Sequence, residues 1–216
     1  MKKTMREIVG ARGSRNQDLA QQLVYDAMDA DTPERMAALI SQALKLDPEN
    51  VDALLIMATM ADFEGEQRID FLRMIVERGA KRLGKKAFKE LVPHFWGFLE
   101  TRPYMRARQE LAEELRAAGR FEEAPVEYAE MLALNENENQ GVRYHPLPCL
   151  LALNRLEDAR SLMKRYADDI KWNTVFAWCH VLERVLSADE PGAKKALAAT
   201  REQNGFTEAY VKGHRK

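Results

Sequence analysis

The sequence predicts an all-α protein, a right-handed α-solenoid of about five helical hairpins with one short inserted helix or turn near residues 81–102. Composition favours helices. Gly and Pro number only 11 and 8 in 216 residues, and the abundant Leu, Ala, Glu, Arg and Met residues lose little rotamer freedom in a helix. A repeated pattern favours hairpins, because residues 119–124 (GRFEEA) return 35 positions later as residues 154–159 (NRLEDA). A hairpin with one apolar face buries that face only by stacking on its neighbours.

Residues 101–143 form the hairpin to which the other segments align. Leu111, Ala112 and Leu115 give its first helix an apolar face, Gly119 lies in the turn, and a second amphipathic helix follows. The whole chain is then expected to form helices near 16–30, 33–46, 51–62, 67–80, 102–118, 121–134, 139–153, 155–166, 172–186 and 190–203, with a short closing segment at 206–211. The excess residues fall between the second and third hairpins, so we assign the inserted helix and turn to residues 85–100.

The spacing of small residues resembles the tetratricopeptide repeat pattern. Alanines recur 34 or 35 residues apart at the same point of each second helix, at Ala124, Ala159 and Ala193. Residues 43–50 (ALKLDPEN) are the strongest single signature. Pro48 there ends one helix, and Asp47 or Asn50 caps the next.

Charge is nearly balanced over the chain. Lys and Arg total 33 against 34 for Asp and Glu, so no general field attracts phosphate backbones. Only the ends are basic, and they hold Lys2, Lys3, Arg6, Arg12 and Arg15 at one end and Lys212, His214, Arg215 and Lys216 at the other. We interpret residues 1–15 as a flexible basic arm that adds solubility and residues 16–216 as the tetratricopeptide-like array. Nucleic acid is a disfavoured partner.

Two features predict a cytoplasmic protein. Cys149 and Cys179 lie among apolar neighbours in predicted helices, which suits buried thiols in a reducing compartment. Residues 1–17 lack the apolar core of a secretory signal, and no window approaches the ~20 apolar residues that a membrane span needs. We therefore expect no association with a membrane.

No pattern predicts catalysis. The chain contains no glycine-rich phosphate loop, nucleophile elbow or HExxH sequence. His145 and Cys149 have a spacing that suits a metal, but Pro146 and Pro148 lie between them and the remaining His and Cys residues are scattered. We expect no enzyme activity, no metal and no cofactor.

The most unusual local sequence is Phe95-Trp96-Gly97-Phe98, which is followed by Arg102 and Tyr104. Its aromatic side chains either form an exposed anchor for a partner protein or fill the gap that the insertion leaves in the stacking of hairpins. We favour packing for the cluster. Arg102 and Tyr104 beside it are candidates for one wall of a groove.

A second candidate site is residues 139–144 (NQGVRY), which we expect to enter the first helix of the fourth hairpin. Asn139, Arg143 and Tyr144 there would line the concave surface and hydrogen-bond a peptide backbone or carboxylate. Equally, Asn139 caps the helix and Arg143 pairs with a nearby Glu. The two-carboxylate clamp of chaperone-binding tetratricopeptide proteins is not reproduced at the corresponding positions, which are Asp18, Gln21, Tyr25, Asp52, Leu55, Thr59, Arg106, Gln109 and Glu113. A receptor for chaperone tails is therefore disfavoured.

The order of several short segments resembles the suppression-of-tumorigenicity-seven family and the bacterial tetratricopeptide proteins similar to it. The matching segments are residues 51–57, 104–108, 111–112, 119–120, 150–153, 166–169, 204 and 209–211, which are spread over most of residues 18–213. The resemblance implies a scaffold role and transfers no catalytic residue. Eukaryotic members look membrane-associated through a hydrophobic N-terminal segment, and residues 1–17 show no such segment.

We therefore predict a non-catalytic scaffold or adaptor that binds a peptide or helix of another protein on its concave surface. The candidate contacts are Trp96, Arg102, Tyr104, Arg106, Asn139, Arg143 and Tyr144. One alternative is a structural repeat protein that forms a homo-oligomer through its ends or through Phe95 and Phe98. A weaker alternative is nucleic-acid binding through the basic termini, with a steep salt dependence.

Overall fold

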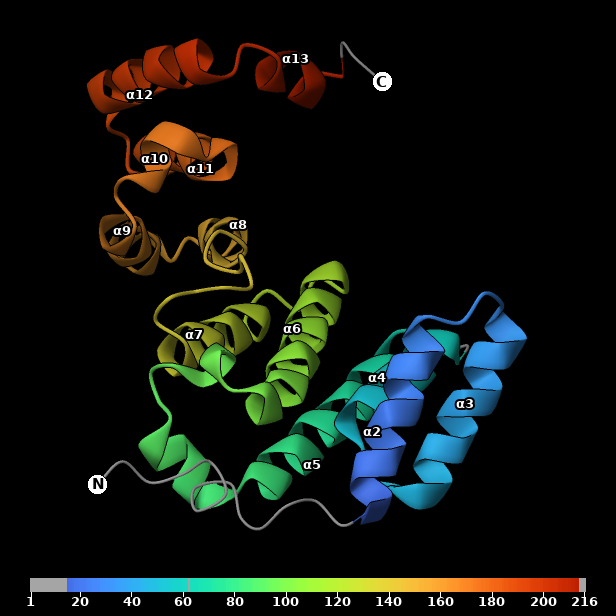
Figure 1. Cartoon of the computed structure of the whole chain (residues 1–216). Coiled ribbons are helices and arrows are strands. Elements are labelled where there is room, and N and C mark those ends of the chain that lie inside the picture. Colours follow the sequence, from blue (N-terminus) through green and yellow to red (C-terminus); the bar gives the residue numbers. More distant parts are fainter. Residues whose placement is uncertain (1–14, 62, 214–216) are drawn as a thin grey trace. The chain divides into compact units, whose positions relative to one another are not determined.

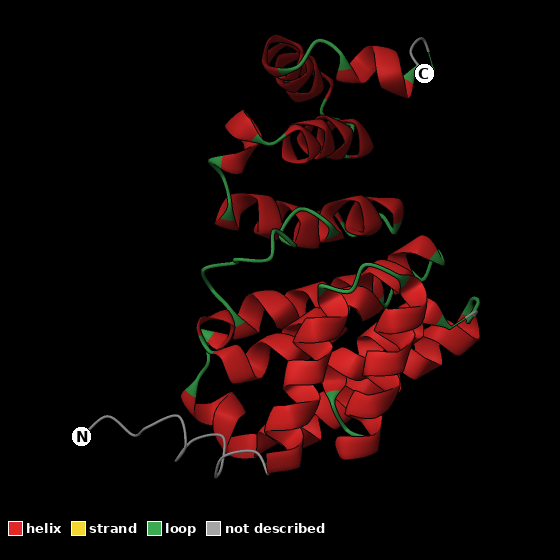
Figure 2. Cartoon of the chain, turned by 45° about the vertical axis from the view of Figure 1, so that its right-hand side comes forward, coloured by secondary structure: helices red, strands yellow, loops and turns green. Residues whose placement is uncertain are grey.

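A computed structural model describes residues 15–61 and 63–213, and over these residues all regular secondary structure is helical (Figure 2). The prediction of an all-α protein is confirmed. An isolated bridge between His94 and Asn135 is the one extended pairing in these ranges. The chain divides into two compact units, Met1–Gln140 and Gly141–Lys216, which are described separately.

The first unit contains three helical hairpins and a short insertion (Figure 1). Its helices are α2 (Arg15–Met28), α3 (Pro33–Leu46), α4 (Val51–Met60), α5 (Glu66–Glu90), η1 (Phe95–Gly97), η2 (Leu99–Thr101), α6 (Arg102–Ala117) and α7 (Ala124–Leu134). Helix α2 packs against α3, α4 against α5, and α6 against α7. Helix α4 also contacts both α2 and α6, so the first helices of the three hairpins follow one another through the unit.

The boundary between α3 and α4 forms as the sequence predicts. Helix α3 ends at Leu46, and Asp47 at its C-cap pairs with Arg82 Nη1 at 2.7 Å. Asn50 is the N-cap of α4, because its Oδ1 accepts a hydrogen bond from the Ala53 amide at 2.9 Å. Of the two capping candidates, Asn50 therefore caps the following helix and Asp47 closes the preceding one.

The inserted segment lies close to its predicted place, but it begins as a continuation of α5. The helix expected at 67–80 runs on to Glu90, with a kink at Gly84, whose backbone has φ +71° and ψ 160°. A residue with a side chain is strained in this left-handed region, so glycine permits the change of direction there. Residues 91–101 then form η1 and η2 before α6 begins.

One side chain of the aromatic cluster in the insertion is core, and the other two are half-buried. Phe95 is fully buried, with its ring centroid 5.1 Å from that of Phe88 and 6.3 Å from that of Tyr104. Trp96 and Phe98 are half-buried. The packing interpretation is confirmed for Phe95, and self-association through an exposed Phe95 side chain is excluded.

The second unit contains α8 (Pro146–Ala152), α9 (Leu156–Arg165), α10 (Asp169–Trp172), α11 (Thr174–Leu186), α12 (Glu190–Gln203) and α13 (Thr207–Val211). Helix α8 packs against α9, and α11 packs against α12 and also contacts α8 and α9. The core between them contains Leu147, Leu150, Leu151, Ala159, Met163, Phe176 and Cys179.

The helix predicted over residues 139–153 is wrong at its start, because α8 begins at Pro146. Gly141 has φ +71°, outside the helical region. Pro146 and Pro148 lack the amide hydrogens that a helix through them needs, and proline is tolerated only in a first turn. Residues 139–145 are therefore a loop with turns, and Asn139 does not cap a helix.

Some predictions fall on residues that the structure does not describe. The arm at residues 1–15 lies outside the described ranges except for Arg15, which begins α2. The basic residues His214, Arg215 and Lys216 also lie outside them. Every described helix is too short or too polar to traverse a lipid bilayer.

Candidate functional site

Helices α2, α4 and α6 carry polar side chains that bond to one another across the first unit. Asp52 accepts a hydrogen bond from Gln21 Nε2 at 3.2 Å and from Arg106 Nη2 at 2.7 Å. Gln21 in turn accepts one from Asn50 Nδ2 at 3.1 Å. Helical spacing from Gln21, Asp52 and Arg106 defines what we name the α2–α4–α6 face, formed by Asp18, Gln21, Tyr25, Asp52, Leu55, Thr59, Arg102, Arg106, Gln109 and Glu113.

Asp52 and Arg106 form the central ion pair of this face. The Asp52 side chain is 1% exposed and the Arg106 side chain 37% exposed. Both carboxylate oxygens of Asp52 are engaged, because Arg106 Nε donates to Oδ1 at 3.0 Å while Nη2 donates to Oδ2. Arg106 is therefore neutralised inside the protein, and it offers a ligand polar contact without net charge.

Amide side chains extend the network along α6. Gln140 Nε2 donates to Gln109 Oε1 at 2.8 Å, and Gln109 Nε2 donates to Glu113 Oε1 at 2.8 Å. Gln140 Nε2 also lies 3.4 Å from the Met105 carbonyl oxygen. The Oε1 atom of Gln140 is buried and receives no hydrogen bond from the described residues. These bonds attach the loop after α7 to α6.

Three of the predicted contact residues meet where the insertion reaches α6. The Trp96 amide donates to Asn135 Oδ1 at 3.2 Å, and Asn135 Nδ2 donates to Asn139 Oδ1 at 3.1 Å. Arg102 Nε donates to the Trp96 carbonyl oxygen at 3.0 Å, with its guanidinium 5.4 Å from the centroid of the Trp96 ring. Asn135, which is 3% exposed, joins these residues, and its place after the last apolar residue of α7 is the only sequence signal that marks it.

Tyr104 is a core residue. Its side chain is 3% exposed and meets the Phe88 ring edge-on, with 5.4 Å between the ring centroids. Burial raises the pKa of Tyr104, and the charge of Arg108, whose Nε donates to the phenol oxygen at 3.0 Å, partly offsets this. A ligand on the surface of α6 does not reach this ring, so Tyr104 is not among the residues proposed to contact a ligand on the α2–α4–α6 face.

Arg143 and Tyr144 belong to the second unit. Arg143 Nε lies 2.5 Å from Asp169 Oδ2, and the guanidinium is 5.6 Å from the centroid of the Tyr166 ring. Tyr144 is half-buried and packs against the core of that unit, with its ring centroid 4.6 Å from that of His145. Arg143 therefore pairs with an acidic residue, Asp169, and its contact with a peptide stays a prediction.

Helix α11 carries an apolar stripe that sequence reasoning missed. It consists of Val175, Trp178, Leu182, Val185 and Leu186, which recur on one side of the helix. Val175 is 36% exposed, Leu182 50%, Val185 58% and Leu186 49%, while Trp178 is half-buried. The opposite side of α11 is also apolar, so the helix lacks the polar face that normally marks solvent. Apolar residues on both sides of α11 are therefore the sequence signal that marks this stripe.

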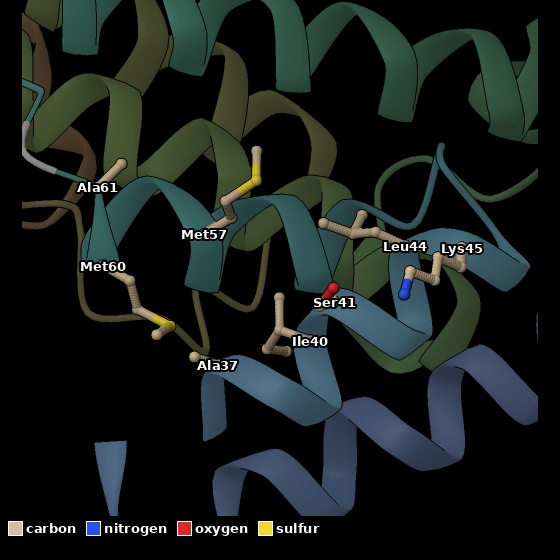
Figure 3. Close-up of a pocket in the computed structure, with 8 residues that line it drawn as sticks. All are labelled: Ala37, Ile40, Ser41, Leu44, Lys45, Met57, Met60 and Ala61. Atoms are coloured by element: carbon tan, nitrogen blue, oxygen red, sulfur yellow. The ribbon is translucent and has the colours of Figure 1, made fainter. Parts of the chain in front are cut away.

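Two shallow hollows lie within the units. The first, about 500 Å³, is lined by Ala37, Ile40, Ser41, Leu44 and Lys45 of α3 and by Met57, Met60 and Ala61 at the end of α4 (Figure 3). Its lining is apolar apart from Ser41 and Lys45, so it offers no pair of groups for proton transfer.

The second hollow, about 570 Å³, lies among α10, α11 and α12. Its polar lining residues are Lys171, His180, Arg184, Asp189, Lys195, Thr200, Glu202 and Gln203. Burial and the charge of Arg184 lower the pKa of His180, and Glu183 partly offsets them. Arg184 is already paired with Asp189 at 3.2 Å.

Within residues 15–61 and 63–213 no group of three or more His, Cys, Asp or Glu side chains is placed to hold a metal ion. Cys149 and Cys179 are buried thiols that form no disulfide within the described residues, and burial raises the pKa of Cys179 to about 12. Comparison of the chain with protein-family models, with curated proteins and with solved structures found no match.

Proposed function

We propose that the protein is a non-catalytic scaffold of the tetratricopeptide type, whose hairpins form a right-handed solenoid and whose α2–α4–α6 face binds a peptide or helix of another protein. The observation that carries the proposal is the polar network from Gln21 through Asp52 to Arg106, which links the first helices of three successive hairpins. The resemblance to the suppression-of-tumorigenicity-seven family supports a scaffold role. A cytoplasmic location is part of the proposal, because both cysteines are buried and neither forms a disulfide within the described residues.

The network leaves the α2–α4–α6 face rigid and partly apolar. Asp52 accepts hydrogen bonds from both Gln21 and Arg106, so its buried carboxylate needs no water or ligand as a partner. Tyr25 lies one turn beyond Gln21 and is 51% exposed, and Thr59 is exposed on α4. Tyrosine supplies much contact area for little loss of conformational entropy, which is why it is common at binding hot spots.

Site-specific photocrosslinking tests this proposal. A photoreactive benzoylphenylalanine replaces Tyr25 or, in a second variant, Thr59, and the matched control places it at Val126, which is 54% exposed on α7. On irradiation in the native host, positions 25 and 59 are expected to form adducts with the same partner protein, identified by mass spectrometry, while position 126 forms none. Equal adducts from position 126, or no adducts from positions 25 and 59, contradict the proposal.

A second candidate function is self-association through the α11 stripe. The charged residues of α11 are Glu183, which is fully buried, and Arg184, which pairs with Asp189; the stripe itself is uncharged. Two copies of an uncharged apolar stripe can pack against each other about a two-fold axis without repulsion. We therefore assign the proposed self-association to α11 rather than to Phe95.

Sedimentation equilibrium tests self-association. Wild type is expected to form dimers over the micromolar range, and the variant carrying both Leu182→Glu and Val185→Glu is expected to raise the dimer dissociation constant by about a hundredfold, as for the loss of two contact residues. Leu19→Glu is the control, because Leu19 is 47% exposed on α2. A wild-type protein that stays monomeric at about 100 μM, or dimers that survive in the double variant, overturns this candidate.

A further inference from the structure

Arg102 differs from the other half-buried arginines of the described chain. Each of the others lies close to a carboxylate: Arg68, Arg73, Arg78, Arg106, Arg108, Arg120, Arg143, Arg160 and Arg184. Arg102 is half-buried as well, but its contacts are with Trp96, and no described carboxylate pairs with it. Partial burial of an unpaired charge costs solvation energy, and an arriving anion removes that cost.

The Arg102 side chain is held in place without being neutralised. Its Nε donates to the Trp96 carbonyl oxygen at 3.0 Å, and its guanidinium lies 5.4 Å from the centroid of the Trp96 ring. Trp96 is itself fixed, because its amide donates to the buried Asn135 side chain. With Nε occupied, the two Nη groups of the planar fork remain to donate hydrogen bonds. An orienting contact of this kind reduces the entropy lost when a ligand binds.

The neighbours of Arg102 limit the ligand to a small anion with a single charge. Arg106, one turn further along α6, is neutralised by Asp52. Asn139 is exposed and uses its Oδ1 to accept from Asn135, so its own amide nitrogen is left to donate to a peptide carbonyl. One unneutralised guanidinium matches a carboxylate, whereas a phosphate dianion or a nucleic-acid backbone calls for several cations.

We propose that Arg102 binds a carboxylate of the peptide that occupies the α2–α4–α6 face, so that the partner is an acidic peptide segment. This inference rests on the proposed scaffold function for the identity of the ligand, and on the unpaired guanidinium for its chemistry. The carboxylate comes from an Asp or Glu side chain or from a chain terminus. Both present two oxygens to the fork in the same way.

The first test measures the site directly with acetate as the probe. In nitrogen–proton NMR spectra of the full chain, the Arg102 Nε–H signal is assigned by its loss in Arg102→Lys. Acetate is expected to shift this signal saturably in the millimolar range, while sodium chloride at equal ionic strength does not. Arg116, which is exposed on the same helix and pairs with no carboxylate of the described residues, is the internal control for nonspecific screening. An Arg102 signal that follows Arg116, or that moves more with phosphate than with acetate, overturns the inference.

The second test identifies the source of the carboxylate with a random peptide display library. Wild type is expected to select peptides with Asp or Glu at one shared position, and Arg102→Gln is expected to bind the selected peptides about tenfold more weakly, as for the loss of one charge-assisted hydrogen bond. Arg116→Gln is the matched control and is expected to bind as wild type does. Synthesis of one selected peptide with a free or an amidated carboxyl end separates a terminal carboxylate from an acidic side chain.

The outcomes separate the inference from the function on which it rests. Selected peptides without a shared acidic position, or unchanged binding by Arg102→Gln, overturn the carboxylate site and leave the scaffold proposal standing. Saturable acetate binding at Arg102 with no peptide selected upholds the anion site and overturns the peptide ligand. Thermal unfolding of Arg102→Gln with a midpoint near that of wild type shows that a loss of binding does not come from unfolding.

Discussion

Phe95→Ala is expected to destabilise the first unit by about 3 to 5 kcal/mol, the range found when a buried phenylalanine is truncated. Phe95 is fully buried between the end of α5 and the start of α6, against Phe88 and Tyr104. Truncation removes the ring and leaves a cavity that these neighbours fill only in part. Urea unfolding followed by circular dichroism measures the change, and hydrogen exchange of α5 and α6 localises it.

Leu99→Ala is the matched control for Phe95→Ala. Leu99 lies four residues further along the same insertion and is 68% exposed, so its truncation is expected to change the free energy of unfolding by less than about 0.5 kcal/mol. If Phe95→Ala lowers the free energy of unfolding by less than about 1 kcal/mol, the insertion is not part of the core.

Glu183→Gln is expected to destabilise the second unit by about 3 kcal/mol at pH 7, the lower end of the range for breaking a buried ion pair. Glu183 is fully buried, and its Oε1 accepts from Arg160 Nε at 2.6 Å and from Ser187 Oγ at 2.7 Å. Arg184 Nε lies 2.8 Å from the other oxygen. A neutral amide of the same shape removes the buried charge that both guanidinium groups share, and leaves Arg160 paired with Glu157 alone and Arg184 with Asp189 alone.

The effect of Glu183→Gln is expected to depend on pH. Burial acts to raise the pKa of Glu183, but the hydrogen bonds from Ser187 and Arg160 and the charges of Arg184 and Arg160 outweigh it, and the pKa is lowered. A group with a lowered folded pKa stabilises the protein above its unfolded pKa, about 4.3 for Glu, and loses this contribution as pH falls through the folded value. The difference in the free energy of unfolding between Glu183→Gln and wild type should therefore be largest at neutral pH and shrink below about pH 4.

Urea unfolding at pH 7, 5 and 3.5 measures this difference. Asp158→Asn is the control, because Asp158 is 54% exposed and pairs with Arg155 on the surface. An exposed pair contributes about 0 to 1 kcal/mol, so this control should stay close to wild type at each pH. If the free energy of unfolding of Glu183→Gln differs from that of wild type by a constant amount down to pH 3.5, Glu183 does not titrate as the structure implies.

The sequence located most helices because their signals are local. The break at residues 47–50 follows from Pro48 and from the capping side chain of Asn50. The turn at residue 119 follows from its glycine, which readily adopts the φ of +73° found there. Apolar residues at a period of 3.6 then mark the buried side of each helix, as for Leu111 and Leu115. The predicted helix at 139–153 is wrong at its start because Gly141, with φ +71°, and the prolines at 146 and 148 break the helical backbone there.

The candidate site was predicted less well, because each side chain there takes its role from a partner far along the chain. Arg106 is neutralised by Asp52, which lies 54 positions earlier, and Arg102 is held by Trp96. Tyr104 was expected on a groove wall and lies in the core instead. Helical spacing places a residue on a face, but it does not say which neighbouring helix covers that face.

The sequence by itself determined the helical class, the order of the hairpins and the position of the insertion, since these depend on contacts between residues a few positions apart. Only the tertiary structure decided that Phe95 is core, that Asn135 joins the insertion to the loop after α7, and that Arg102 pairs with no carboxylate of the described residues. Those properties depend on which helices pack together and at what separation, and the energy of a buried ring or an ion pair follows from that packing rather than from local propensity.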